Sequence, residues 1–332
     1  MELFHTIAGI LFHTEMDTAI GPLQSGAFDF FKTLPGCVDI RLNIKGIEED
    51  RLTAPPLSPR QEKELKDLLD LDERVTRTTL VIPPIADPDW MRRIKEQLDT
   101  ESPLAGYPLL RSPEVRSRVL AHLSRSDSVR IIAHLLTFEI YDYKAAAADI
   151  FYLSSQRSIL TDNIAFNGIR RLFATFLTAF SAVVVHSSGI VLDGKAALFL
   201  APDEGGKSTI LSLFKRGDIL CDDYNIIKKE GDNLAVHNTP WGSLMSKKSI
   251  SAPLGGLFLL EKAPRFELVS IRPEEMLSFA WIENLRFLEA LPRSYRLTAF
   301  SILDEACRTV PVFRLRFPKD AVAEEAVRRV LS

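Results

Sequence analysis

The sequence has few cysteines, and they lie far apart. Cys37, Cys221 and Cys307 form none of the paired spacings that disulfide frameworks and structural metal sites use. We therefore expect a reducing environment and a cytoplasmic location. The chain also lacks internal repeats and low-complexity stretches, so neither a repeat architecture nor a compositionally biased, disordered chain is expected.

An excess of positive charge is absent as well. The 41 lysines and arginines are balanced by 44 aspartates and glutamates, for a net charge of −3, so the chain has no long-range attraction for a polyanion and nucleic-acid binding is not expected. The longest apolar run, Leu172–Val185, has about 14 residues, too few to span a bilayer. Met1–Glu15 has no basic region typical of a cleaved signal. We expect no membrane association, and we interpret the apolar run as a buried helix that leads into a strand.

The composition is that of a globular protein: 332 residues, of which 46% are hydrophobic and 26% charged. The proline-rich segment Leu52–Arg60 separates structural elements near the start. We predict a smaller α+β region over residues 1–155, a candidate for docking a partner or substrate, and a second region over residues 156–332. The sequence leaves oligomer formation open.

Hydrophobic periodicity and turn residues predict the elements of each region. In the first region, the predicted strands are Phe4–Phe12, Val38–Ile44, Val129–Tyr143 and Asp149–Leu153, and the predicted helices are Gln61–Leu71 and Ser112–Leu123, the latter capped by Ser112. In the second region, the predicted helices are Asn163–Phe180, Lys207–Lys215, Pro273–Leu291 and Asp320–Leu331. The predicted strands there are Ala182–Val185, Lys195–Leu200, Ile219–Cys221, Asn225–Lys229, Leu234–His237, Gly256–Leu260, Phe266–Ile271 and Val310–Phe317.

The strongest functional signal is a glycine-containing segment between a predicted strand and a predicted helix. It matches the phosphate-loop pattern GxxxxGK[ST] except at the first position, where alanine replaces glycine. The backbone N–H groups of such a turn can face the phosphates of a nucleotide. The lysine supplies a charge near the terminal phosphates, and the serine supplies an oxygen to magnesium. The candidate nucleotide-binding residues are Ala201, Pro202, Asp203, Glu204, Gly205, Gly206, Lys207, Ser208 and Thr209.

Two carboxylates in this segment are unusual. Asp203 and Glu204 lie in the turn that would surround a polyanion, so their charge would oppose phosphate binding unless the side chains point outward. The alternative to nucleotide binding is a structural glycine turn or a degenerate loop.

A pair of aspartates follows the next predicted strand. Asp222 and Asp223 come 14 and 15 residues after Ser208. If the strand that follows the loop's helix lies beside the loop's own strand, these acids reach the magnesium and the terminal phosphate. One could then contact the metal, and the other could act as general base. The alternative is an Asp-rich turn that leaves a strand. His186 also ends a strand, and by pattern alone a structural role explains it better than a catalytic one.

Together these features resemble a known family. The stretch Val185–Asp223, VHSSGIVLDGKAALFLAPDEGGKSTILSLFKRGDILCDD, is similar to the core of the HPr kinase/phosphorylase family, whose relatives include phosphoenolpyruvate carboxykinases. The resemblance implies an α/β fold with a phosphate-loop core and a mixed sheet. It also implies that Lys207 and Ser208 hold phosphate and magnesium, that His186 lies close to the transferred phosphoryl group, and that Asp223 is the base with Asp222 supporting it as a metal ligand.

One part of the family's pattern is absent from the sequence. The Glu-Arg-Gly run of HPr kinases is replaced by HNTPWGSLMSKK at residues 237–248, so recognition of HPr itself is not implied. Within this stretch, Trp241 could contact a nucleotide base or substrate, or could simply pack. Lys247 could neutralise phosphate charge, or could belong to a solvated face.

The sequence thus predicts a kinase that uses ATP or GTP with Mg²⁺ and phosphorylates a hydroxyl of a protein, a peptide or a small molecule. The alternative is a catalytically weak, nucleotide-binding regulatory module, which the substitutions at Ala201, Asp203 and Glu204 favour. A carboxykinase-like reaction is a third option, but the sequence shows no second metal cluster for it.

Overall fold

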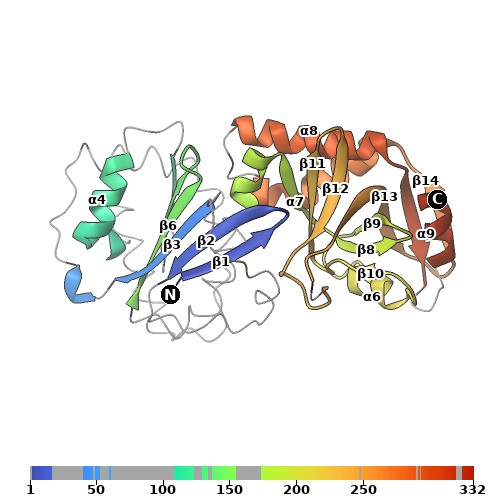
Figure 1. Cartoon of the computed structure of the whole chain (residues 1–332), viewed down its shortest axis with the longest axis horizontal. Coiled ribbons are helices and arrows are strands. Elements are labelled where there is room, and N and C mark those ends of the chain that lie inside the picture. The colour runs from blue at the N-terminus through green and yellow to red at the C-terminus, as the bar shows by residue number, and fades with distance from the viewer. Residues whose placement is uncertain are drawn as a thin grey trace. The chain divides into compact units, whose positions relative to one another are not determined.

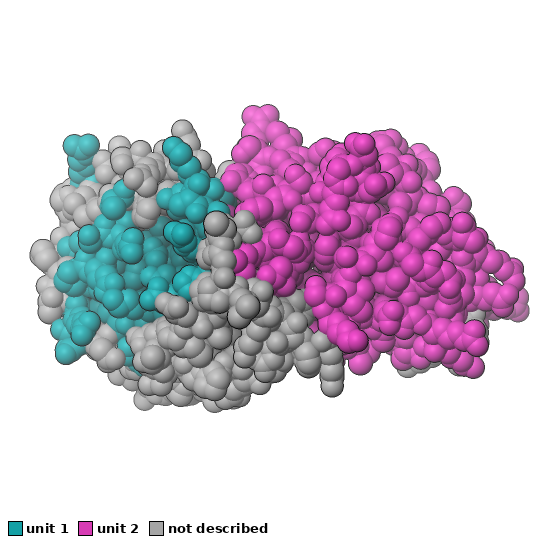
Figure 2. All heavy atoms as spheres, in the orientation of Figure 1, with its two compact units in different colours: residues 1–4, 12–24, 36–172 teal, residues 5–11, 25–35, 173–332 magenta. Residues whose placement is uncertain are grey.

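The protein divides into two compact units, and each is described by itself. The structure is a computed structural model that describes residues 2–16, 40–47, 49–52, 60, 108–122, 129–133, 137–154, 173–246, 248–288, 291, 293–318 and 324–332. One unit comprises residues 1–4, 12–24 and 36–172, and the other comprises residues 5–11, 25–35 and 173–332 (Figure 2). Helices and mixed sheets confirm the predicted α/β fold class.

The first sheet has the strand order β1-β2-β3-β6-β5-β4. Its strands are β1 (Glu2–Ile7), β2 (Ile10–Met16), β3 (Ile40–Ile47), β4 (Val129–Ala133), β5 (Thr137–Asp142) and β6 (Ala147–Leu153). Strands β2, β3 and β6 are parallel, whereas β4 and β5 are antiparallel to their neighbours.

Two stretches of this sheet that were each predicted as a single strand contain two strands. The stretch Phe4–Phe12 is not one strand but a hairpin, because Ala8 and Gly9 have φ values of 54° and 71°, and two successive positive φ values reverse the chain. The stretch Val129–Tyr143 likewise contains two antiparallel strands. Alternation shows which residues are strand-like, but it does not show where the chain turns.

Helix α4 (Pro113–His122) accompanies this sheet, and its start agrees with the prediction. The Ser112 hydroxyl accepts a hydrogen bond from the Val115 N–H at 3.4 Å, as an N-cap residue does. Two short 3₁₀ helices are η2 (Glu49–Arg51) and η4 (Pro108–Arg111). The buried core consists of Ile47, Leu109, Leu110, Val115, Val119, Phe138, Ile140 and Phe151. The predicted helix Gln61–Leu71 lies outside the described residues.

The second sheet has the order β10-β8-β9-β13-β12-β11-β7, with β15 paired to β13 and β14. Its strands are β7 (Ala182–His186), β8 (Ser188–Leu192), β9 (Lys195–Leu200), β10 (Asp218–Ile219), β11 (Tyr224–Glu230), β12 (Asn233–Asn238), β13 (Ser251–Lys262), β14 (Glu267–Ser270) and β15 (Val312–Phe317). Its helices are η7 (Leu177–Phe180), α6 (Lys207–Ser212), α7 (Pro273–Leu288), α8 (Arg293–Thr309) and α9 (Glu324–Leu331). Of the predicted helix Asn163–Phe180, residues 163–172 lie outside the described part, and residues 173–180 are helical.

Strand β9 lies in the interior of this sheet. Its sequence KAALFL is apolar after Lys195, and the five residues Ala196–Leu200 are buried. A continuous apolar strand is typical of a parallel sheet that is covered on both faces, and β9, β13 and β15 are parallel. The core around them consists of Ile190, Leu192, Ala197, Phe199, Ala201, Ile210, Leu211, Phe258, Leu260, Leu315, Phe317, Val327 and Leu331.

Helices α7 and α8 pack on each other and on the edge of the sheet that β7 and β11 form (Figure 1). Helix α8 was not predicted from the sequence. Its signal was nevertheless present, because the buried residues Ala299, Ile302, Leu303 and Ala306 follow the i, i+3, i+4, i+7 spacing of one helix face. None of the helices in the described ranges is long and apolar enough to cross a membrane.

Candidate functional site

The phosphate-loop segment connects the end of β9 to the start of α6, as predicted. The Gly205 N–H donates to the Pro202 carbonyl at 2.9 Å. Glu204 and Gly206 then take φ values of 60° and 100°, and Lys207 begins the helix. A left-handed conformation suits glycine but strains glutamate.

The local packing explains why alanine is tolerated at the first position of the motif. Ala201 is fully buried, and it is not among the described residues that have a positive φ. Its methyl group lies only 2.5 Å from where a Cβ on Gly205 would be. The two small residues therefore share one space, and glycine is required at 205 rather than at 201.

The side chain of Lys207 lies along the inside of the loop. Its ammonium donates to the carbonyls of Ala201 at 2.9 Å and Pro202 at 3.1 Å, and it lies 4.0 Å from the carboxylate of Asp203. Lys207 is 8% exposed. These contacts with the loop carbonyls hold the ammonium at the inside of the loop.

His186 lies opposite the loop, at the end of β7. Its Nε2 atom is 3.0 Å from Oδ1 of Asp223 and 3.5 Å from Oδ1 of Asp203. Its ring stacks on Tyr224, with the centroids 5.4 Å apart. Although His186 is only 2% exposed, Asp223 is 40% exposed, so the carboxylate is within reach of a substrate.

Strand register brings Asp223 beside His186. Strands β7 and β11 are antiparallel, with Tyr224 directly opposite His186, and the Ser187 N–H donates to the Asp223 carbonyl at 3.0 Å. Asn225 strengthens this junction by donating to the carbonyls of Ser187 at 2.7 Å and Cys221 at 3.2 Å. The relative position of the histidine and the aspartate is therefore fixed by backbone pairing.

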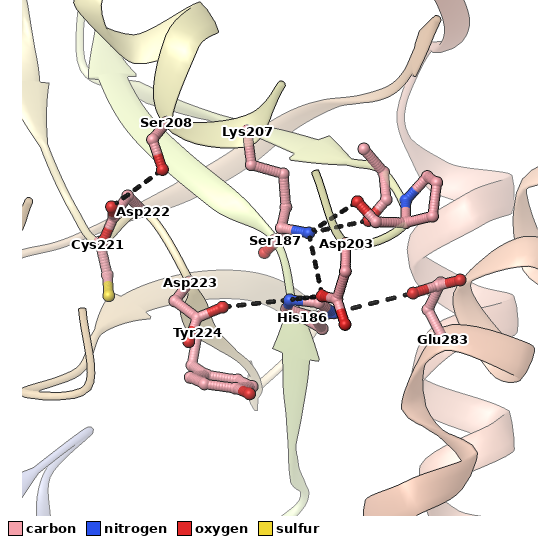
Figure 3. A network of polar contacts seen from close by, with 12 residues as sticks. His186, Ser187, Asp203, Lys207, Ser208, Cys221, Asp222, Asp223, Tyr224 and Glu283 are labelled. Carbon is pink, nitrogen blue, oxygen red and sulfur yellow. Dashed lines mark hydrogen bonds and ion pairs between the residues drawn. The ribbon is translucent and has the colours of Figure 1, made fainter. Parts of the chain in front are cut away.

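Asp203 of the loop lies between the side chains of Lys207 and His186. Figure 3 shows its carboxylate directed toward both the His186 ring and the Lys207 ammonium. A single carboxylate thus marks a point where a lysine from one segment and a histidine from another converge. Asp203 is 78% exposed, so solvent weakens these contacts.

Asp222 faces the start of α6. Its Oδ2 atom accepts hydrogen bonds from the hydroxyls of Ser208 at 3.1 Å and Ser243 at 2.7 Å, and its Oδ1 atom accepts the Leu244 N–H at 3.0 Å. A Cβ on Gly242 would lie 2.4 Å from Oδ1 of Asp222. Close backbone approach by residues 242–244 therefore orients the carboxylate toward Ser208.

The aspartates reach the loop by a route other than the predicted one. The strand that follows α6 is β10, which pairs with β8 and not with β9, so the expected adjacency of the two strands is wrong. The contact arises instead because residues 220–223 pair with the β7–β8 junction: the Gly189 N–H donates to the Cys221 carbonyl at 2.8 Å, and the Leu220 N–H donates to the Gly189 carbonyl at 2.9 Å.

The remaining predicted contacts lie elsewhere. The Trp241 indole is buried at 1% exposure and packs on Phe173, with ring centroids 5.2 Å apart, which corresponds to the packing alternative. Lys247 lies outside the described residues. Within the described ranges, no group of three or more His, Cys, Asp or Glu side chains is arranged to hold a metal ion.

Sequence reasoning missed the contribution of α7. Oε2 of Glu283 lies 3.7 Å from Nδ1 of His186, and Oδ1 of Asn284 accepts the backbone N–H of His186 at 3.0 Å. Ser243 was also missed, although it comes two residues after Trp241, which was a candidate. Nothing local could have indicated the two α7 residues, because about a hundred positions separate them from the histidine.

Comparison with known proteins finds similarity among solved structures. No protein-family model matches the sequence, and no curated protein matches it. Among solved structures, the chain is similar to the HPr(Ser) kinase/phosphatase from Coxiella burnetii at 15% sequence identity and a TM-score of 0.25, and the match covers 44% of this chain and 94% of that one.

Proposed function

We propose that this protein is an ATP-dependent kinase that transfers the terminal phosphoryl group to a hydroxyl of a protein, a peptide or a small molecule. The convergence of Lys207 and His186 on one carboxylate beside a phosphate loop carries this proposal. Two basic groups that face a single exposed point form a place for an anion. An aspartate lies 3.0 Å from the histidine at the same place.

Each residue has a role in this reaction. Lys207 and the loop backbone bind the phosphates, and His186 lies beside the terminal phosphoryl group. Asp223 takes the proton of the acceptor hydroxyl as that oxygen forms its bond to phosphorus. The bond from the terminal phosphorus to the bridging oxygen breaks at the same stage, and ADP leaves.

The donor set near the start of α6 fits magnesium. Oγ of Ser208 and Oδ2 of Asp222 are 3.1 Å apart, and oxygen is the ligand that magnesium prefers, usually from one or two protein groups together with phosphate and water. A bound magnesium ion would neutralise phosphate charge. Ser208 and Asp222 would hold it, and Ser243 orients Asp222 through the 2.7 Å hydrogen bond.

Residues 1–155 are proposed to dock the acceptor or a partner protein. The separate buried core around α4 supports this role, because a region with its own core can present a surface that does not depend on the nucleotide site.

A second function, a catalytically weak regulatory module that binds nucleotide, is favoured by one observation. Asp203 occupies the point between His186 and Lys207 that the phosphoryl group would need, while the lysine donates to its own loop carbonyls. A protein that only senses nucleotide could keep this arrangement.

Turnover distinguishes the two functions. The wild-type protein, Lys207→Ala and Asp223→Asn are incubated with Mg²⁺ and labelled ATP or GTP together with pooled hydroxyl compounds and peptides, and ADP or GDP release is measured. We expect Lys207→Ala to lose nucleotide affinity and Asp223→Asn to bind normally but turn over about 10²–10⁴-fold more slowly. Lys229→Ala and Asp232→Asn are the matched controls.

The opposite outcomes are equally informative. Binding without turnover in the wild-type protein, whatever the acceptor, would favour the regulatory module. Failure of both nucleotides to bind at millimolar concentration would show that the segment 201–209 is not a phosphate-binding loop.

A further inference from the structure

Helix α7 contacts His186 through two consecutive residues. The Asn284 side chain accepts the backbone N–H of His186 at 3.0 Å and donates to the Ala280 carbonyl at 2.6 Å, so it ties the end of β7 to its own helix. Asn284 is fully buried. Glu283 precedes it, and the position of its carboxylate relative to the imidazole is therefore set by packing.

The carboxylate of Glu283 faces the side of the imidazole that the loop does not reach. Its Oε2 atom is 3.7 Å from Nδ1, and Nδ1 is a buried atom that has no hydrogen-bond partner within the described part of the chain. Figure 3 shows Glu283 and Asp223 on opposite sides of the ring. A buried ring nitrogen is costly without a partner, and an approach of about 1 Å would bring the carboxylate within hydrogen-bond distance of Nδ1.

Three carboxylates of the described residues face the ring nitrogens of His186. Asp223 and Asp203 face Nε2 at 3.0 and 3.5 Å, and Glu283 faces Nδ1 at 3.7 Å. The ammonium of Lys207 lies 4.0 Å from the Asp203 carboxylate. The ring also stacks on Tyr224.

This arrangement favours one protonation state. Ionised carboxylates only accept hydrogen bonds, and a neutral imidazole has a single N–H. A neutral ring that donates to Asp223 would turn the lone pair of Nδ1 toward the carboxylate of Glu283. Protonation of both nitrogens removes that repulsion and gives each carboxylate a donor.

We propose that Glu283 is a positioning residue that keeps Nδ1 of His186 protonated, so that the ring presents a cationic N–H at Nε2 to Asp223 and to the transferred phosphoryl group. The catalytic part of this proposal rests on the kinase function proposed above. The imidazolium would then supply charge to the phosphoryl group, while Asp223 keeps the role of base. Glu283 itself does not touch the reacting atoms.

The test uses the full-length protein with ¹⁵N-labelled histidine. Both ring nitrogens of His186, assigned with a His186→Gln variant, are expected to be protonated in the wild-type protein at neutral pH. Glu283→Gln removes the charge but keeps the size, and it is expected to leave His186 with one protonated nitrogen at the same pH. Glu283→Asp keeps the charge and is expected to restore the wild-type signals in part.

Kinetics supply the second measurement. For Glu283→Gln we expect kcat to fall about 10–100-fold, as when the partner that orients a metal-bound histidine is removed, with an unchanged KM for ATP and with part of the loss recovered at lower pH. Glu274→Gln is the control, because this glutamate lies on the same helix but pairs with Arg308 at the surface. It is expected to change neither the histidine signals nor kcat.

Three results would overturn the proposal: a neutral His186 in the wild-type protein, unchanged His186 signals in Glu283→Gln, or equal changes in Glu274→Gln. The wild-type spectrum decides the protonation state even if a variant fails to fold. Because the spectra require no turnover, an inactive wild-type protein would contradict the kinase function without affecting the spectroscopic test.

Discussion

The carboxylate of Asp203 offers the most direct test of how the loop treats a phosphate. Its Oδ1 atom lies 3.5 Å from Nε2 of His186 and 4.0 Å from Nζ of Lys207, and these are the two groups proposed to bind the terminal phosphoryl group. An incoming phosphate must displace this carboxylate and is also repelled by it. The substitution Asp203→Asn keeps the shape of the side chain and removes its charge.

The expected change in MgATP affinity depends on how exposed the Asp203 side chain is. Because Asp203 is 78% exposed, its contacts are screened, and each exposed pair contributes about 0.2–1 kcal/mol. The two contacts that an incoming phosphate must displace therefore amount to about 0.4–2 kcal/mol together. The dissociation constant for MgATP should therefore fall about 2–30-fold in Asp203→Asn.

Calorimetric titration with MgATP and MgADP measures this change. We expect a larger gain for ATP than for ADP, because only ATP carries the terminal phosphoryl group, and we expect the gain to shrink at high salt. The control is Glu204→Gln, which removes the same charge from the adjacent exposed position. Weaker ATP binding by Asp203→Asn, or an equal gain from Glu204→Gln, would show that the carboxylate of Asp203 does not compete with phosphate.

Two further predictions concern packing and pH. Gly242→Ala would place a Cβ 2.4 Å from the Asp222 carboxylate and 2.5 Å from the Cys221 sulfur, so we expect urea unfolding to show a loss of about 1–3 kcal/mol and the Mg²⁺ dependence of nucleotide binding to weaken; unchanged values of both would contradict the geometry. Burial raises the pKa of the Cys307 thiol from 9.0 to about 12, so the folded state holds this proton more tightly than the unfolded chain does. The contribution of this thiol to the free energy of unfolding is fully present below pH 9.0 and is lost as the pH rises toward about 12, by up to about 1.4 kcal/mol per pH unit. The unfolding free energy of Cys307→Ala should fall less steeply over that pH range than that of the wild-type protein. Equal pH dependence in the two proteins would show that the Cys307 thiol is not responsible.

Local signals predicted much of the second unit. The strand Lys195–Leu200 was predicted with the bounds that β9 has, because a short apolar run between turn residues is typical of a buried strand. The dipeptide Asp-Gly is a hairpin signal, and Asp193 and Gly194 form a turn with φ values of 51° and 83°. The start of α6 at Lys207 follows from the glycines that precede it.

Long-range packing decided what the sequence could not show. The alternation of apolar and polar residues did not reveal the turn at Ala8 and Gly9, because both strands of a hairpin have the same two-residue period. Asp222 approaches Ser208 only because the chain at residues 220–223 pairs with the β7–β8 junction. That pairing joins segments about thirty residues apart and leaves no trace in either segment's periodicity.

The sequence by itself determined the chemistry that is present: a phosphate-loop segment with Lys207 and Ser208, a following aspartate pair, and a histidine at a strand end. Residue type and local spacing carry that information, because a turn, a helix start and a strand end depend on neighbours in the chain. Only the tertiary structure decided how these parts face one another. The pairing of β7 with β11 places Asp223 at 3.0 Å from His186, and the packing of α7 brings Glu283 to the far side of the ring. Such contacts depend on the sum of many weak packing interactions across the fold, and no single stretch of sequence encodes them.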